Sequence, residues 1–161
     1  MKLIELTKGY FAKVDDWRFE ELSKHSWCVT TWKGKIYARR RKPGPVKDGC
    51  PDIRMHRQVM GVTDPKIEVD HIDGDTLNCQ EGNLRASTRS QNACNRGVDK
   101  RSKTGYKGVS AVAGTKKWRA YIVKDCKQKS LGWHDCPIKA ARAYDTAATE
   151  LHGEFANLNF P

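Results

Sequence analysis

Long hydrophobic runs are missing from this sequence. No stretch approaches the roughly 20 consecutive apolar residues that a membrane-spanning helix needs, which argues against a membrane partner. Residues 1–17 turn acidic before an apolar block typical of a signal peptide can form. We therefore expect a protein that is not secreted and that works in the cytoplasm.

Paired cysteine motifs are missing as well. No C-x-x-C pair occurs, and the spacing of the cysteines is uneven. The pattern favours reduced thiols, some of them buried, over disulfides or a zinc site. A structural zinc fold built from the cysteines and histidines stays open as an alternative. The six cysteines are Cys28, Cys50, Cys79, Cys94, Cys126 and Cys136.

Acidic side chains are few. The 161 residues include 30 Lys and Arg against 19 Asp and Glu, a formal net charge of +11, which suggests a polyanionic partner. Residues 1–60 carry 14 basic and 7 acidic side chains, residues 104–161 carry 9 and 5, and residues 61–103 balance at 7 each. This layout suits two DNA-contacting flanks around a metal-binding centre.

The first 60 residues predict a β-rich region with one short helix. Asp15 or Asp16 can cap the helix, and residues 27–38 predict a hairpin that turns at Lys33-Gly34. A loop is expected over 43–51, because this segment is rich in Pro and Gly.

A basic run leaves the predicted hairpin. We expect Arg39, Arg40 and Arg41 to contact DNA phosphates, although such a run is also typical of a solvated edge. Residues 53–60 mix apolar and basic side chains, and their pattern fits either a strand or a helix. Within them, His56 is favoured as a packed structural histidine over a phosphate contact.

The last third of the chain predicts a sheet covered by one helix. Residues 97–104 are polar and basic and indicate a linker. Residues 137–152 carry apolar side chains at three- and four-residue spacing, with Pro137 in the first turn and Gly153 as the stop. The predicted strands are 106–112, 118–124 and 129–134.

The most informative stretch is 69–96, VDHIDGDTLNCQEGNLRASTRSQNACNR. A β-prone run ends in Asp70 and His71, a Gly- and Asp-rich loop follows, and a second extended run begins at Asn83. Residues 88–91 have the form of a capping box, which predicts a short helix that carries Asn92. The expected order is strand, loop, strand, helix.

These residue types suit phosphodiester chemistry. Asp70 and Asn92 offer two hard oxygen ligands, which suit a Mg²⁺ ion that keeps waters and accepts a phosphate oxygen. His71 points to the opposite face of the strand from Asp70, so it need not bind the same ion. Its neutral imidazole can instead take a proton from an attacking water.

This stretch resembles the HNH nucleases, whose three name-giving positions match His71, Asn83 and Asn92. The resemblance implies a ββα-metal (His-Me finger) fold and an H-N-N variant of the kind found in phage and intron homing endonucleases. It further implies that Asp70 and Asn92 hold one divalent ion, Mg²⁺ or Mn²⁺. In that arrangement His71 is the general base facing the scissile phosphate, and Asn83 fixes the loop that orients it.

Residues 105–160 resemble the APETALA2-type DNA-binding domain. The matching pieces are Tyr106-Lys107-Gly108-Val109, Trp118-Arg119-Ala120, Leu131-Gly132, the run from Ala140 to Asp145, and Leu158-Asn159-Phe160. In that family a three-stranded sheet enters the major groove while the helix supports it from behind. The DNA-contacting residues that this implies are Lys107, Ser110, Arg119, Tyr121 and Lys129.

The expected fold class is α+β: a ββα-metal nuclease module followed by a three-stranded antiparallel sheet packed on one helix. We expect a basic DNA-contacting region over 1–60, the nuclease core over 61–96, the linker over 97–104 and the DNA-binding domain over 105–161. The expected function is metal-dependent hydrolysis of double-stranded DNA, with nicking by a homing-type enzyme in a bacterial cell. A catalytically silent DNA-binding regulator is the alternative, and monomer or dimer stays open.

The charge balance generates a first prediction. If about six phosphates are contacted, the logarithm of DNA affinity should fall with the logarithm of salt concentration with a slope of about −5. Fluorescence anisotropy of a labelled duplex, titrated at several salt concentrations, measures this slope. A slope near zero would contradict the electrostatic argument.

Overall fold

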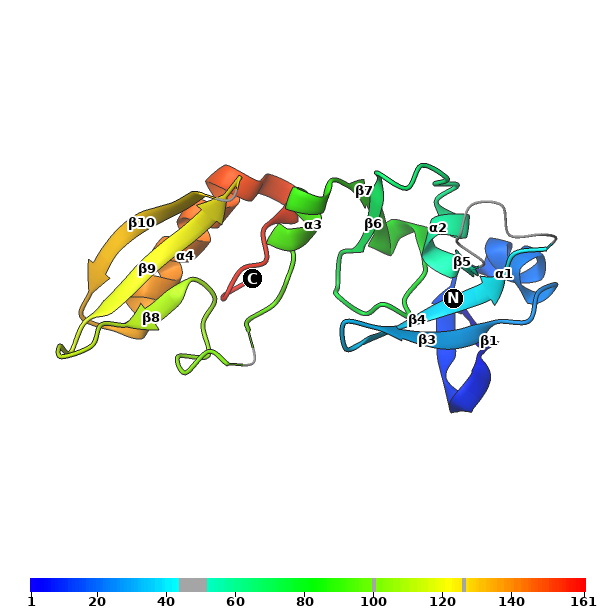
Figure 1. Ribbon diagram of the computed structural model, residues 1–161, viewed down its shortest axis with the longest axis horizontal. Coiled ribbons are helices and arrows are strands. Elements are labelled where there is room, and N and C mark those ends of the chain that lie inside the picture. Colours follow the sequence, from blue (N-terminus) through cyan, green and yellow to red (C-terminus); the bar gives the residue numbers. More distant parts are fainter. Residues whose placement is uncertain (44–51, 100, 126) are drawn as a thin grey trace. The chain divides into compact units, whose positions relative to one another are not determined.

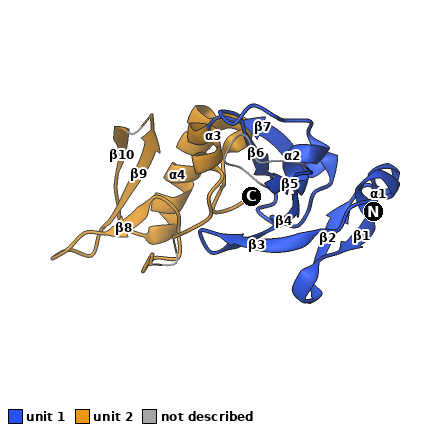
Figure 2. Cartoon of the chain, turned by 45° about the vertical axis from the view of Figure 1, so that its right-hand side comes forward, with its two compact units in different colours: residues 1–88 blue, residues 89–161 orange. Residues whose placement is uncertain are grey.

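A computed structural model describes residues 1–43, 52–99, 101–125 and 127–161 (Figure 1). The chain forms two compact units, residues 1–88 and residues 89–161 (Figure 2). Among the described residues, the first unit contains three small sheets and two α-helices, and the second contains one sheet and two α-helices. This is a mixed α and β architecture.

The first unit opens with a hairpin and a helix. Strand β1 (Lys2–Glu5) pairs antiparallel with β2 (Phe11–Val14), across the short 3₁₀ turn η1 (Thr7–Gly9). Helix α1 (Asp16–Ser23) follows directly. The two strands alternate between exposed and buried side chains, with Ile4, Ala12 and Val14 facing the core, which is the pattern of a sheet with one wet face.

A three-stranded sheet follows, in the order β3–β4–β5. Strands β3 (Cys28–Trp32) and β4 (Lys35–Arg41) are joined at Lys33 and Gly34, whose φ values of 49° and 75° give the left-handed two-residue turn that suits the twist of a hairpin. Strand β5 (Asp52–Arg54) pairs with the end of β4 and leads at once into helix α2 (Met55–Val59).

The third sheet of this unit has two strands. Strand β6 (Glu68–His71) pairs antiparallel with β7 (Leu84–Ser87), which places Asp70 opposite Arg85 and His71 opposite Leu84. The connection between the strands spans residues 72–83 and ends in the 3₁₀ turn η2 (Glu81–Asn83).

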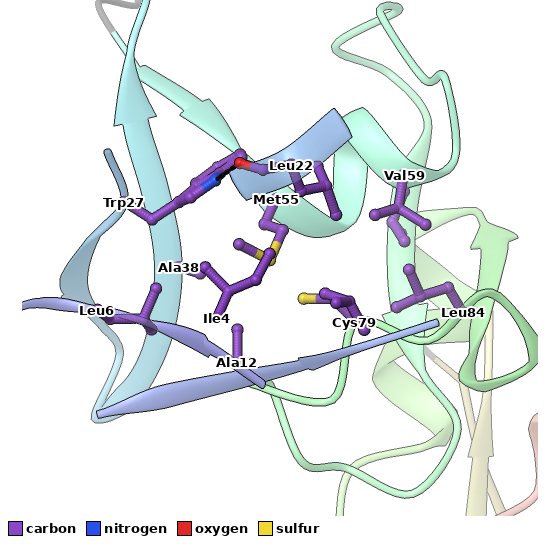
Figure 3. Packing of buried hydrophobic residues seen from close by; sticks show 12 residues of the cluster. Ile4, Leu6, Ala12, Leu22, Trp27, Ala38, Met55, Val59, Cys79 and Leu84 are labelled. Atoms are coloured by element: carbon purple, nitrogen blue, oxygen red, sulfur yellow. Dashed lines mark hydrogen bonds between the residues drawn. The ribbon is translucent and has the colours of Figure 1, made fainter. Parts of the chain in front are cut away.

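One hydrophobic core joins these sheets and helices (Figure 3). Side chains from every part of the unit meet there, so segments far apart in sequence bury one another. The buried members are Ile4, Leu6, Ala12, Val14, Leu22, Trp27, Ala38, Met55, Val59, Val69, Cys79 and Leu84. Trp27 also donates its indole N–H to the Leu22 carbonyl at 2.8 Å, which satisfies its buried polar group.

The second unit begins with helix α3 (Arg89–Cys94) and continues as an antiparallel sheet in the order β10–β9–β8. Its strands are β8 (Val109–Ala111), β9 (Trp118–Lys124) and β10 (Lys127–His134). Helix α4 (Pro137–His152) and the 3₁₀ turn η3 (Gly153–Phe155) close the unit.

Small residues let α4 lie close to this sheet. Ala140, Ala141 and Ala148 are fully buried and share clusters with Ala120 and Ile122 of β9. Trp118 is partly buried and packs against one of these clusters.

Several expected elements are confirmed. The helix over 137–152 has the expected bounds. The hairpin turns at Lys33-Gly34 as expected, and its strands span 28–32 and 35–41 where 27–38 was expected for the whole hairpin. The ambiguous run 53–60 is a strand followed by a helix. The expected loop over 43–51 lies almost wholly outside the described residues. The boundaries at 60/61 and 97–104 stay predictions.

No helix in the described parts of the chain combines the length and the apolar character that crossing a membrane would require.

Gly108 generates a prediction about stability. Its φ is +70°, and a Cβ there would overlap the Tyr144 ring and the Tyr121 carbonyl, whereas Gly114 has a φ of +73° with open space around it. Gly114→Ala should cost about 1–2 kcal/mol for the left-handed backbone alone. Gly108→Ala should cost roughly 1–3 kcal/mol more, because the overlap adds to the same backbone strain.

Urea unfolding of the two variants measures the difference directly. Equal losses of unfolding free energy in Gly108→Ala and Gly114→Ala would contradict the close approach of Tyr144 to Gly108.

Candidate functional site

A buried ion pair lies at the centre of the β6–β7 hairpin. Asp70 is 6% exposed, and its Oδ2 accepts hydrogen bonds from Arg85 Nε at 3.0 Å and from Arg85 Nη2 at 2.8 Å. The strand register causes this contact, because residues directly opposite each other in an antiparallel pair point to the same face. The guanidinium therefore balances a carboxylate that would be costly to bury alone.

His71 lies in a small cluster of rings. Its ring centroid is 5.0 Å from that of His56 and 6.3 Å from that of Tyr37, and the His56 and Tyr37 centroids are 5.6 Å apart. Strands β6 and β4 and helix α2 each contribute one of these residues. His71 is only 4% exposed, so the ring that was expected to face a phosphate is enclosed by its neighbours.

Burial keeps both histidines neutral. It lowers the pKa of His56 to about 3, with the nearby His71 and the positive charge of Arg54 adding to the effect. Burial also lowers the pKa of His71 to about 4, against the opposing charges of Asp70 and Asp73 and with the help of Lys35. A neutral imidazole is the form that can accept a proton.

Asn83 closes the loop that follows His71. Its Nδ2 donates to Asp73 Oδ1 and to the Asn78 carbonyl, both at 2.9 Å, and its Oδ1 accepts from the Asp73 backbone N–H at 3.1 Å. Its own carbonyl accepts from the Ile72 N–H at 2.9 Å. Asn78 Nδ2 donates to the other oxygen of Asp73 at 2.7 Å, so both carboxylate oxygens of Asp73 are bonded within the loop.

The same loop is bonded to the first two sheets. The Lys13 N–H donates to the Leu77 carbonyl at 2.9 Å, and the Cys79 N–H donates to the Lys13 carbonyl at 2.8 Å. Lys13 Nζ forms an ion pair with Asp75 at 2.9 Å, and the Thr76 hydroxyl donates to the Ile36 carbonyl of β4. These bonds fix the β6–β7 hairpin, and with it His71, beside β4.

The expected metal ligands lie in different units. Asp70 is on β6, whereas Asn92 lies in α3, as the capping box at 88–91 predicted. Their convergence on one ion thus stays a prediction. Among the residues that the structure describes, no group of three or more His, Cys, Asp and Glu side chains is placed to hold a metal ion.

The three expected basic contacts divide between two faces of their sheet. Arg39 and Arg41 lie on the face of the sheet opposite the core residue Ala38, and Arg39 forms an ion pair with Asp52. Arg40 points the other way, because neighbouring strand residues alternate. Its Nε donates to Gln58 Oε1 at 2.8 Å, and its guanidinium lies 5.8 Å from the Trp27 ring centroid. The structure thus places Arg40 on the core side.

In the second unit, the strand register puts Ser110, Arg119 and Tyr121 on the outer face of the sheet, and the Arg119 guanidinium lies 5.4 Å from the Tyr121 ring centroid. Lys129 differs from the expected placement. It pairs with the buried Ile122 and therefore extends from the edge strand on the face that α4 covers.

Lys107 is also engaged within the second unit. Its Nζ donates to the Cys94 carbonyl at 2.5 Å and lies 5.9 Å from the Tyr144 ring centroid. Burial lowers the pKa of Lys107 to about 8. The expected DNA contact by Lys107 stays a prediction, and it would require this hydrogen bond to be exchanged.

Sequence reasoning missed Tyr37 and Arg85 as parts of the site. Arg85 could have been found, because closing strands 68–71 and 84–87 into a hairpin puts it opposite Asp70. Tyr37 carried no such indication, since its contact with His71 joins residues 34 positions apart through the packing of two separate sheets.

The sequence is similar to known proteins, both over the segment that contains His71 and over most of the chain. Residues 41–94 match the HNH endonuclease family. A protein of Acanthamoeba polyphaga mimivirus named Uncharacterized HNH endonuclease L560 is 31% identical over 158 residues, which cover 94% of this chain and 76% of the viral protein. Protein 3.8 of Escherichia phage T7 is 34% identical over 107 residues, covering 64% of this chain and 88% of the phage protein.

A plant protein resembles a shorter part. The AP2-like ethylene-responsive transcription factor TOE2 of Arabidopsis thaliana is 43% identical over 55 residues, which are 34% of this chain and 11% of the plant protein.

The buried histidines generate a prediction about pH. The folded-state pKa of His56 is about 3 and the unfolded value is about 6.5, so the unfolded chain binds more protons between these two pH values. The free energy of unfolding therefore decreases as the pH falls through this range. Lowering the pH from about 7 to about 4.5 should cost roughly 2–3 kcal/mol through His56 alone.

His56→Gln removes this titration, so its unfolding free energy should depend on pH less than that of the wild type by about that amount. Urea unfolding at the two pH values, with chelator present, measures it. His25→Gln, outside the ring cluster, is the matched control. A pH dependence that is the same in all three proteins would show that His56 does not stay neutral in the folded state.

Proposed function

Because the chain belongs to the HNH endonuclease family, we propose that it cleaves phosphodiester bonds of double-stranded DNA with the help of one divalent metal ion. The observation that carries this proposal is the similarity to the mimivirus HNH endonuclease along 94% of the chain. The geometry of the first unit supports it, since His71 is neutral and directly follows a carboxylate in the paired strand β6.

Asp70 and Asn92 are the residues that would hold the ion. A carboxylate and an amide oxygen are hard ligands, which favours Mg²⁺ or Mn²⁺ with several retained waters over zinc. A carboxylate has about four acceptor positions, so an ion held by Asp70 would share this carboxylate with the guanidinium of Arg85. When bound, such an ion polarises the scissile phosphate and stabilises the charge that develops on it.

His71 takes the role of general base. Its neutral ring can accept the proton of the attacking water as the new phosphorus–oxygen bond forms. The phosphorus–oxygen bond to the leaving sugar oxygen breaks in the same displacement, and that oxygen takes a proton from solvent water. A base must reach that water, so the proposal requires the ring, 4% exposed in this structure, to become accessible when DNA binds. Asn83 acts as a positioning residue, because it closes the loop that begins at the next residue, Ile72.

The second unit is proposed to bind the DNA duplex through the outer face of its sheet. The likeness to the plant transcription factor over 55 residues supports this, as does the excess of basic residues in this part of the chain. Ser110, Arg119 and Tyr121 lie on that face. One proposed active site per chain implies that a single strand is nicked in each event.

Replacing His71 tests the chemistry. His71→Ala should lower the rate of plasmid nicking in Mg²⁺ or Mn²⁺ by about 100-fold or more, because the base is lost. DNA affinity, measured by anisotropy with chelator present, should change by less than about twofold. The conversion of supercoiled to relaxed plasmid gives the rate, and His25→Ala is the control for a change of histidine elsewhere in the unit.

Two outcomes would contradict the proposal. A wild-type protein that binds DNA but never nicks it with either metal ion would favour a DNA-binding regulator. Stoichiometric zinc in protein purified without chelator, together with full cleavage by Asp70→Ala, would contradict the assigned metal ligands.

A further inference from the structure

The sheet β3–β4–β5 has two chemically different faces. Val29 and Ala38 are paired and lie on the core side. Residues paired directly across an antiparallel ladder share a face, so the register defines the opposite side. We call this the outer face of β3–β5. It consists of Cys28, Thr30, Trp32, Lys35, Tyr37, Arg39, Arg41, Asp52 and Arg54.

This outer face is strongly basic. It carries Lys35, Arg39, Arg41 and Arg54 against a single carboxylate, Asp52, which forms an ion pair with Arg39. A cavity of about 340 Å³ is lined by Arg39, Arg41, Asp52 and the neighbouring Cys28. The remaining positive charges raise the electrostatic potential along the face and favour a polyanion there.

A series of cation–ring and ring–ring contacts crosses the outer face of β3–β5 and ends at the candidate site. The Arg54 guanidinium lies 5.9 Å from the Trp32 ring centroid and 5.5 Å from that of Tyr37, and Tyr37 contacts His71. Lys35 also lies near enough to lower the pKa of His71. The basic face and the proposed general base are therefore neighbours within one unit.

Trp32 lies at the solvent-exposed end of this series of contacts. It is 54% exposed at the tip of the β3–β4 hairpin, with Lys33 5.9 Å from its ring centroid and Arg54 on its own face. Single exposed aromatic residues are common on proteins, so exposure alone decides nothing. An indole flanked by cations on a basic face is, however, the combination that binds nucleic acid strands through bases or sugars and phosphates.

We propose that the outer face of β3–β5 holds a DNA strand beside His71, with Arg54 binding a phosphate and Trp32 packing against a sugar or base. This inference rests on the proposed nuclease function and adds a second DNA-contacting surface, separate from the sheet of the second unit. Arg54 and Trp32 position the strand and take no part in the chemistry.

The chain offers a matched control for Trp32. Trp17 on α1 is 63% exposed, and its ring centroid lies 4.3 Å from the Arg18 guanidinium. Arg18 already donates to Glu21 at 3.0 Å and to the Val59 carbonyl at 3.2 Å, so its charge is partly satisfied within the protein. Trp17 thus resembles Trp32 in exposure and cation contact but lies off the outer face.

DNA binding by the full-length variants tests the inference. With chelator present, Trp32→Ala and Arg54→Gln should each weaken the affinity for a short labelled duplex of mixed sequence by about fivefold or more. Trp17→Ala should change it by less than about twofold. Arg54→Gln should also reduce the salt slope by about one, and Arg54→Lys should restore it, because one phosphate contact is lost and regained.

The outcomes separate this inference from the proposed function. If the wild type nicks plasmid while Trp32→Ala and Arg54→Gln bind and nick like Trp17→Ala, the inference is overturned and the nuclease proposal stands. If the two variants bind more weakly as expected but the wild type never nicks, the nuclease proposal fails and the DNA-binding face stands. Thermal unfolding checks each variant; if Arg54→Gln is unfolded, the exposed Trp32→Ala decides.

Discussion

The loop of residues 72–83 is the constraint on which the arrangement of the first unit depends. It is bonded to β2 through Lys13 and to β4 through Thr76, while Asn83 closes it internally. These bonds hold the β6–β7 hairpin against two other sheets. Because the loop begins directly after His71, the same bonds also fix the position of that ring beside Tyr37 and His56.

Burial and charge have separate roles around this histidine. Enclosure among rings keeps His71 and His56 neutral, as their lowered pKa values indicate, while Arg85 balances the carboxylate of Asp70 one residue away. A basic surface formed by β3–β5 borders the same rings. A neutral imidazole, a paired carboxylate and a cationic surface thus lie within one unit.

Strand register decides which basic residues can contact a partner. The run 39–41 is uniform in sequence, yet alternation sends Arg40 toward Gln58 and Trp27 while its neighbours share the outer face. The same rule places Lys129 on the side of Ile122. Basic composition therefore indicated a polyanion-binding protein, but the face on which each cation lies depends on pairing that a composition count does not contain.

Local patterns determined much of this protein. The hairpin turn at Lys33-Gly34, the helix over 137–152 and the strand–loop–strand order around His71 and Asn83 follow from short-range turn, capping and periodicity rules. Tertiary structure alone decided the contacts between distant segments. One is the enclosure of His71 by Tyr37. Another is the hydrogen bond of Asp15, whose carboxylate accepts from the Glu81 N–H at 2.7 Å and does not cap α1. The physical reason is that such contacts join distant segments through one shared core, where a side chain's partner is set by the fold and not by its neighbours in sequence.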